Sequence, residues 1–212
     1  SFFMQRLEHE FGDKLRLTRE IFTNQYHKPF LYQLVSSQLD MDRMDYLNRD
    51  SFYTGVSEGV IGSDRIIEML DVHEGNLVLE EKGIYSVEKF ITARRLMYWQ
   101  VYLHKTVVSA EHLLINTLKR AKQVSLEGKE LFASPALAYF LKNNITRSDF
   151  ETNPLTLDTF ALLDDYDIMG AIKVWQFCDD TILSDLSKRL INRKLFKIKI
   201  LKSSVKLKEM HS

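Results

Sequence analysis

The sequence predicts a mainly α-helical protein. Only 8 glycines and 3 prolines interrupt its 212 residues, a length that suffices for one sizeable domain with a buried core. Apolar residues recur three and four positions apart through most of the chain, as they do along the buried face of a helix. Residues 86–124 contain neither Gly nor Pro. We therefore expect one long helix there, or two helices joined by a kink.

In the chain before this stretch, proline and glycine residues mark the ends of the expected helices. Helical spacing predicts three early helices, over residues 2–11, 14–22 and 30–52. Pro29 separates the second from the third, and Gly55 follows the third, where glycine often ends a helix. Ser63 is expected to cap a short helix with Asp64 in its first turn, because the helix dipole favours a carboxylate there.

The rest of the chain adds more helices and the few strands that we expect. Residues 76–85, NLVLEEKGIY, alternate apolar and polar side chains around a glycine, which predicts a small β-hairpin. Ser134 before Pro135 predicts a capped helix start. Further helices are expected near residues 155–163, 166–177 and 179–192. The tail from Leu195 contains KIKI, and its period of two predicts a strand.

Domain organisation and location follow from this pattern and from composition. We expect residues 1–125 to form the C-terminal part of a helical domain and residues 126–212 a helical extension ending in a β-strand. The chain opens without Met inside an expected helix, SFFMQRLEHEF, so we expect it to be part of a longer protein. The one cysteine, Cys178, permits no disulfide within the chain. We interpret it as a small buried hydrophobic residue of a cytoplasmic protein.

The charge balance and hydropathy argue against several classes of partner. Lys plus Arg and Asp plus Glu each number 29, so the net charge is zero. This balance argues against a protein that coats nucleic acid or an anionic membrane. No apolar run approaches the roughly 20 residues of a membrane-spanning helix. We expect neither a membrane nor a nucleic acid as a partner.

The helix expected over residues 30–52 carries an unusual set of polar side chains. Asp42, Tyr46 and Asp50 are spaced four and four, which aligns them on one helical face, and Arg43 follows Asp42 directly. Carboxylates beside a guanidinium suit a site that holds a metal and a phosphate, and a tyrosine one turn on suits a sugar. The alternative is an ordinary solvated face with ion pairs four residues apart.

This helix resembles the signature of HD-domain phosphohydrolases of the deoxynucleoside triphosphate triphosphohydrolase type. The matching string is DMDRMDYLNRD, followed by SFYTGV. A second stretch, FITARRLMYWQVYLHK over residues 90–105, is similar to a later helix of the same family. There an arginine, here Arg94, precedes a Tyr-x-His-Lys string by eight positions. The resemblance covers residues 30–120 and implies an HD-domain-like helical bundle.

The resemblance implies a metal site and a phosphate site. Asp42 would be a ligand of a divalent metal, which would be Mg²⁺, Mn²⁺ or a transition metal. Arg43, beside it, would act in catalysis by contacting the phosphates, which Arg94 would reach from the second helix. The implied reaction is hydrolysis of a dNTP to deoxynucleoside and tripolyphosphate.

The resemblance also implies a sugar site and a regulatory site. Tyr46 would pack on the deoxyribose, Asp50 would accept a hydrogen bond from its 3′-hydroxyl, and Tyr102 would wall the nucleoside pocket. His104 and Lys105 correspond to positions where relatives bind a regulatory nucleotide between subunits, so we expect a homo-oligomer. Trp99, in the same stretch, is predicted to be a core residue because aromatic residues at helical spacing usually are.

The sequence departs from the family at its defining motif. The family is named for His…His-Asp, and none of the six histidines here is followed by Asp. The metal ligands other than Asp42 would then lie outside the printed sequence. Two alternatives stay open. One is a non-enzymatic nucleotide sensor or scaffold that has lost the metal core, and the other is an HD phosphohydrolase that acts on another nucleotide phosphate ester.

Overall fold

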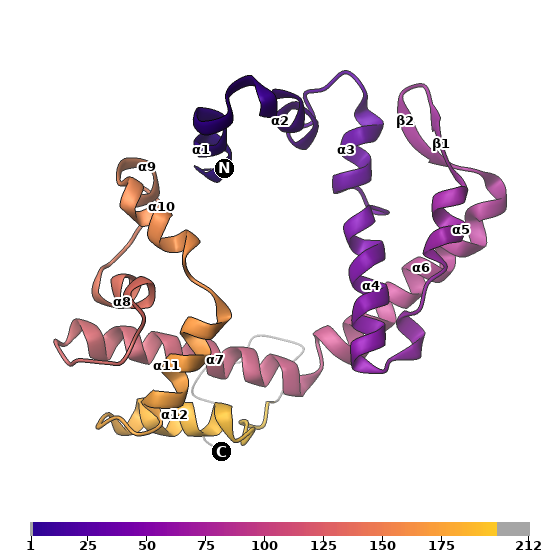
Figure 1. Cartoon of the computed structure of the whole chain (residues 1–212). Helices are drawn as coiled ribbons and strands as arrows, with labels where there is room; N and C mark the ends of the chain where they lie inside the picture. Colours follow the sequence, from indigo (N-terminus) through magenta and orange to yellow (C-terminus); the bar gives the residue numbers. More distant parts are fainter. Residues whose placement is uncertain (1, 199–212) are drawn as a thin grey trace, which may run out of the picture. The chain divides into compact units, whose positions relative to one another are not determined.

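The computed structural model describes residues 2–198, and the chain is mainly helical there, as predicted (Figure 1). The helices of the first half are α1 (Phe2–Phe11), α2 (Arg16–Phe22), α3 (Pro29–Ser36), α4 (Met41–Thr54), α5 (Ser63–Glu68) and α6 (Ile84–Met97). Those of the second half are α7 (Lys105–Leu126), α8 (Pro135–Lys142), α9 (Asp149–Thr152), α10 (Pro154–Ala161), α11 (Asp165–Trp175) and α12 (Thr181–Ile191). Two strands, β1 (Leu70–His73) and β2 (Asn76–Leu79), form one antiparallel pair.

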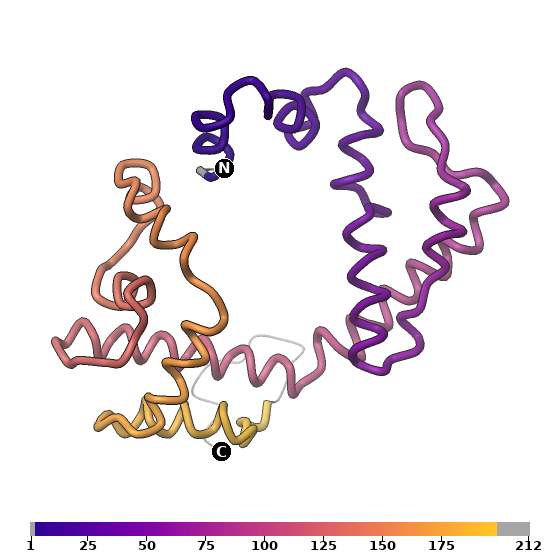
Figure 2. The backbone as a smooth tube through the Cα atoms, in the orientation of Figure 1, coloured from indigo at the N-terminus to yellow at the C-terminus, as the bar shows by residue number. Residues whose placement is uncertain are grey.

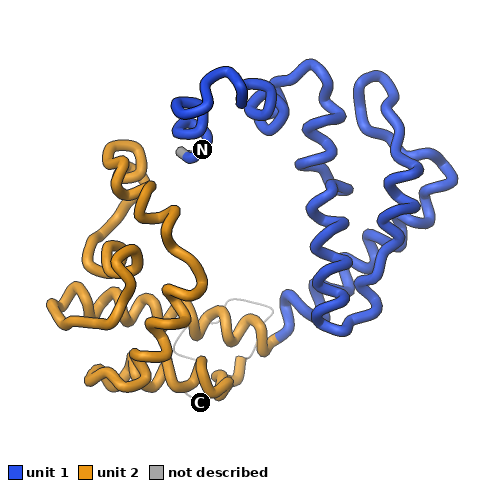
Figure 3. The backbone as a smooth tube through the Cα atoms, in the orientation of Figure 1, with its two compact units in different colours: residues 1–104 blue, residues 105–212 orange. Residues whose placement is uncertain are grey.

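The chain forms two compact units, residues 1–104 and residues 105–212 (Figure 3). The boundary between the units falls at the start of α7, whereas the expected domain boundary after residue 125 falls at its end. The two domains expected from the sequence, 1–125 and 126–212, stay a prediction. No helix among the described residues is both long enough and apolar enough to span a membrane.

The core of the first unit joins α4, α5 and α6. Its buried members are Met44, Leu47, Ile61, Ile66, Phe90, Ala93 and Met97. Figure 2 traces α4 and α6 running close to each other near the C-terminal end of α4. Gly59, in the 3-10 turn Ser57–Gly59, fits between these two helices, since a Cβ there would lie 2.6 Å from Met97 Sδ. This core therefore fixes the two helices that carry the expected site residues.

The helix expected over residues 30–52 is broken into α3 and α4, so its prediction as one helix was wrong. Ser37 is extended, with φ −110° and ψ −173°, which ends α3. Asp40 is the N-cap of α4, and its Oδ1 accepts a hydrogen bond from the Arg43 backbone N–H at 2.8 Å. A buried aspartate that can satisfy a free N–H stabilises a new helix start. Gly55 ends α4 with φ +70°, as the sequence predicted.

The hairpin is present, but it starts earlier than predicted. β1 and β2 cover residues 70–79, whereas residues 76–85 were expected. The turn is Glu74-Gly75, and both residues have positive φ, which matches the twist of a two-residue hairpin turn. Gly83, on which the prediction rested, lies in the 3-10 turn before α6. Gln33 on α3 accepts a hydrogen bond from the Leu77 N–H at 2.6 Å and so ties the hairpin to that helix.

The long stretch 86–124 consists of two helices joined by a distorted segment, which is one of the predicted forms. α6 leads into a π-helix, Tyr98–Tyr102, in which the Leu103 N–H bonds to the Tyr98 carbonyl at 2.8 Å. α7 then begins at Lys105. Single turns of π-helix occur mostly inside α-helices and frequently at functional sites.

The predicted cap of α5 is displaced by one residue. Gly62 rather than Ser63 occupies the N-cap of α5, and Ser63 Oγ instead accepts a hydrogen bond from the Asn48 side chain.

The second unit has its own core, formed by α7, α8, α11 and α12. Its buried members are Ala121, Leu137, Leu141, Ala171, Ile172, Trp175 and Leu183. Ser134 caps α8 as predicted, with its side chain accepting from the Leu137 N–H. Cys178 is half-buried, and burial raises the pKa of its thiol. Residues 194–198 form no strand, and the remainder of the expected tail strand lies outside the described residues.

Candidate functional site

Helix α4 has one face buried in the core and another face that carries the expected site residues. Met44, Leu47 and Ser51 are buried against the core. Asp42 is exposed in the first turn, and Tyr46 and Asp50 are half-buried. The pair Asp45–Arg49 is an exposed ion pair at 2.5 Å and explains two of the charges as an ordinary solvated contact. The remaining polar side chains therefore need another explanation.

A hydrogen bond joins this face of α4 to the π-helix. Tyr102 Oη donates to Asp50 Oδ2 at 2.6 Å. The Tyr102 ring also meets the edges of two other rings, with centroids 6.2 Å from Tyr46 and 5.1 Å from Tyr98. Burial, and then the hydrogen bond to Asp50, raise the pKa of Tyr102 above its ordinary value. Tyr102 thus stays a protonated donor, and the predicted site residues Tyr46, Asp50 and Tyr102 form one cluster.

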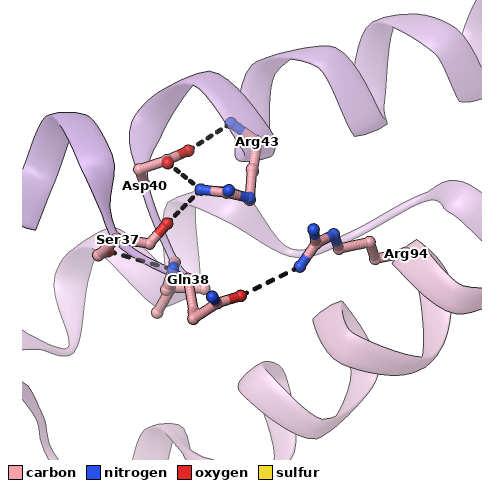
Figure 4. A network of polar contacts seen from close by, with 6 residues as sticks. Ser37, Gln38, Asp40, Arg43 and Arg94 are labelled. Carbon is pink, nitrogen blue, oxygen red and sulfur yellow. Dashed lines mark hydrogen bonds and ion pairs between the residues drawn. The ribbon is translucent and has the colours of Figure 1, made fainter.

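Arg43 is held at the start of α4 by the residues that precede it (Figure 4). Its Nη1 donates both to Asp40 Oδ2 and to the Ser37 carbonyl. Asp40 is only 4% exposed, so its carboxylate is buried and paired with this guanidinium. A guanidinium has five N–H donors, and only Nη1 is used in these contacts. Arg43 is therefore oriented while keeping donors for a ligand.

Arg94 is held by the same segment but from α6. Its Nη1 donates to Gln38 Oε1 at 3.3 Å (Figure 4). Its guanidinium carbon lies 5.8 Å from the centroid of the Tyr98 ring. Its Nε is buried and has no hydrogen-bond partner among residues 2–198. A buried N–H without a partner costs free energy, so Arg94 Nε is a candidate donor to a bound anion.

A cavity of about 510 Å³ lies beside Arg94. Gln38 and Arg94 contribute its polar wall together with Arg95, and the apolar wall is formed by Phe90, Ile91, Tyr98, Trp99 and Leu103. Trp99 is 60% exposed and packs under the Arg95 guanidinium at 4.5 Å, so the prediction that it is a core residue was wrong. Trp99 lies in the π-helix Tyr98–Tyr102, where the residue spacing differs from that of a regular helix.

The described residues do not by themselves form a metal site. Within residues 2–198 no group of three or more His, Cys, Asp or Glu side chains is arranged to hold a metal ion. Asp42 offers a single exposed carboxylate, which is one ligand of the several that a divalent metal needs. Its role as a metal ligand stays a prediction. His104 and Lys105 are both exposed, and their regulatory role also stays a prediction.

Two residues that the sequence analysis did not select contact the predicted arginines. Asp40 pairs with Arg43, and Gln38 bonds to Arg94. Asp40 carried a usable signal, since an aspartate just before a charged helical turn is a common N-cap. Gln38 carried none, because its partner lies 56 residues away in the chain.

Comparison with known proteins finds similarity to an HD-associated family model and to proteins described as phosphohydrolases. Residues 61–134 match the family model described as HD associated region. The solved structure of a phosphohydrolase from Bacteroides thetaiotaomicron is similar to 98% of this chain, with 55% identity and a TM-score of 0.94. YwfO, an uncharacterized protein of Bacillus subtilis, is 41% identical over 177 residues, or 84% of this chain. The Dictyostelium discoideum homolog of the deoxynucleoside triphosphate triphosphohydrolase SAMHD1 is 31% identical over 104 residues, or 46% of this chain.

The chain spans only part of each of these relatives. It covers 52% of the Bacteroides structure, 39% of YwfO and 20% of the Dictyostelium protein. The similarity in sequence and fold therefore concerns this portion of the relatives. The stretches that carried the resemblance lie in the first unit except for their last residue, Lys105, which begins the second unit.

Proposed function

We propose that this chain is the nucleotide-binding part of a metal-dependent HD-type phosphohydrolase that converts dNTPs to deoxynucleoside and tripolyphosphate. The observation that carries the proposal is the hydrogen bond from Tyr102 to Asp50, which joins two predicted substrate residues from α4 and the π-helix. The sequence relationship to phosphohydrolases supports it. A homo-oligomer in the cytoplasm is part of the same proposal.

The sugar end of the substrate is assigned to the tyrosine cluster. Tyr102 uses one oxygen of Asp50, and a carboxylate with two oxygens keeps room for another donor. A 3′-hydroxyl would supply that donor while the deoxyribose packs on Tyr46. A ligand without the hydroxyl would leave a half-buried carboxylate short of one partner, and sites of this kind reject such analogues strongly.

The phosphate end is assigned to Arg43 and Arg94. Both guanidiniums are oriented through one nitrogen, and both keep other N–H donors. Arginine donors in fixed positions suit phosphate oxygens, and they lower the barrier when they stabilise charge that develops during the reaction. The two arginines belong to different helices, so they would contact the phosphate chain from two sides.

The divalent metal of the family is retained in the proposal with Asp42 as its ligand from this chain. The remaining ligands are not among residues 2–198. The residues of this chain would contribute binding, orientation and charge to the reaction.

The test is hydrolysis by the intact protein supplied with Mn²⁺. We expect tripolyphosphate and deoxynucleoside from a dNTP, and little turnover of the 3′-deoxy analogue. Asp50→Asn should weaken that discrimination, whereas Asp45→Asn, which alters the exposed ion pair of the same helix, should not.

Comparing substrates and measuring binding separate the alternatives. Faster turnover of a nucleoside monophosphate or a cyclic dinucleotide than of dNTPs would indicate another phosphate ester as substrate. Tight nucleotide binding without any hydrolysis would favour the sensor, for which the incomplete metal site among the described residues is the motivating observation. An intact protein that neither binds nor hydrolyses nucleotides would refute the proposal.

A further inference from the structure

We propose that residues 37–40 are a positioning segment that sets both phosphate-binding arginines, with Asp40 orienting Arg43 and Gln38 orienting Arg94. The inference rests on the proposed function and adds two residues to it. The connection between α3 and α4 supplies all the contacts within four consecutive residues (Figure 4). One short segment therefore contacts guanidiniums that come from two different helices.

Asp40 combines two tasks in one buried carboxylate. Its Oδ1 accepts from the Arg43 backbone N–H at 2.8 Å and its Oδ2 pairs with the guanidinium of the same residue. The cap fixes the backbone of Arg43, and the pair fixes its side chain, so few rotamers remain open to it. The Ser37 carbonyl accepts from the same nitrogen and closes the arrangement. A long side chain held in advance loses less conformational entropy when it binds a ligand.

Gln38 orients Arg94 without neutralising it. An amide oxygen accepts a hydrogen bond but carries no net charge, so the positive charge of Arg94 remains available for an anion. Gln38 and Arg94 also line the same 510 Å³ cavity. The buried Arg94 Nε still has no hydrogen-bond partner among the described residues. A bound phosphate oxygen would satisfy a donor of this guanidinium.

The break between α3 and α4 is what makes this arrangement available. A continuous helix over residues 30–52 would direct the backbone carbonyl of Ser37 along the helix axis, where it bonds within the helix. The extended conformation of Ser37 releases that carbonyl to Arg43. The break therefore serves both arginines and has a role beyond joining two helices.

The test compares Gln38→Met and Asp40→Asn with matched variants in the second unit. Gln123 Oε1 accepts from Arg120 Nη1 at 3.3 Å, the same bond length as at Gln38. Asp180 is a buried N-cap paired with Arg120, which parallels Asp40. Gln123→Met and Asp180→Asn are thus the controls. Asn at position 40 keeps an oxygen for the cap, so the variant separates orientation of Arg43 from formation of α4.

The readout is affinity of the intact protein for a deoxynucleoside triphosphate and for the corresponding deoxynucleoside, with KM and kcat measured alongside. We expect each segment variant to lose about tenfold in triphosphate affinity, the value of one charge-assisted hydrogen bond, with nucleoside affinity unchanged. Both controls should bind both ligands like the wild type.

Equal losses for the two ligands, or equal losses in the controls, would overturn the inference while leaving the proposed function intact. A wild-type protein that binds neither ligand would overturn both. A segment variant that loses triphosphate affinity together with nucleoside affinity would assign residues 37–40 to folding alone.

Discussion

Replacing Gly59 by alanine should destabilise the first unit by crowding the space between α4 and α6. A Cβ at this position would lie 2.6 Å from Met97 Sδ and 2.9 Å from Ser51 Cβ. Real Cβ atoms do not approach other atoms so closely, so at least one neighbour must move. Met97 is fully buried, and Ser51 Cβ is attached directly to the backbone of α4. Neither neighbour has open space into which it can retreat.

The expected cost is about 2 kcal/mol of unfolding free energy, within the usual range for an overpacked core. Part of that strain should separate α4 from α6. Ser51 directly follows Asp50, and Met97 directly precedes the π-helix, so the Tyr102–Asp50 hydrogen bond should lengthen as well. The change therefore links core packing to the proposed sugar site.

The assay is urea unfolding followed by far-UV circular dichroism, with Gly170→Ala as the matched control. Gly170 lies within α11, and a Cβ there would meet nothing within 4 Å. Alanine in a helix interior is favoured over glycine by about 0.5–1 kcal/mol, so this variant should be as stable as the wild type or slightly more stable. The reasoning is refuted if Gly59→Ala unfolds at the wild-type urea concentration, or if both alanine variants shift alike.

Three further predictions concern single polar contacts. Tyr102→Phe removes the donor to Asp50 and should cost about 2 kcal/mol of unfolding free energy. Because the pKa of Tyr102 is raised, this loss should be constant below the ordinary tyrosine pKa and should shrink only above it. Urea midpoints measured against pH would check this. A hydrogen bond from Arg120 lowers the pKa of Asp180 to about 2, so its stabilisation should be complete above about pH 4 and lost toward pH 2. Asp180→Asn should remove that acid-dependent part, and an unchanged acid limb would contradict the assignment. Lys122→Met removes an ammonium that donates to two carbonyls at the end of α8 and should cost about 1–3 kcal/mol in urea unfolding, whereas a stabilised variant would contradict it.

The sequence predicted most helices because their signals are local. Helical spacing, the cap at Ser134 and the glycine at Gly55 each act within one or two turns, and all appear in the structure. The break before α4 was missed because helical spacing was given more weight than the N-cap signal of Asp40. The hairpin was misplaced because this part of the chain has two glycines at which a turn could form, Gly75 and Gly83. The turn forms at Glu74-Gly75, where both residues have positive φ.

The candidate site was predicted residue by residue but not as an arrangement. Spacing aligned Tyr46 with Asp50, and the resemblance supplied Tyr102, yet only the structure joins the three. Gln38 could not be found, because a hydrogen bond across 56 residues leaves no local pattern. Trp99 was misassigned because the rule for a regular helix was applied to a π-helix.

The π-helix has a consequence for how proteins of this kind can diverge. Its hydrogen bonds span five residues where an α-helix spans four, so the segment Tyr98–Tyr102 holds one residue more than a regular turn. Deleting a single residue there would restore an ordinary α-helix and present a neighbour of Tyr102 to Asp50, without any substitution in α4. The number of residues in this segment can therefore alter the arrangement independently of residue type. Among relatives, a one-residue gap between the positions of Arg94 and His104 would signal a change in the proposed sugar site more clearly than a change of residue type.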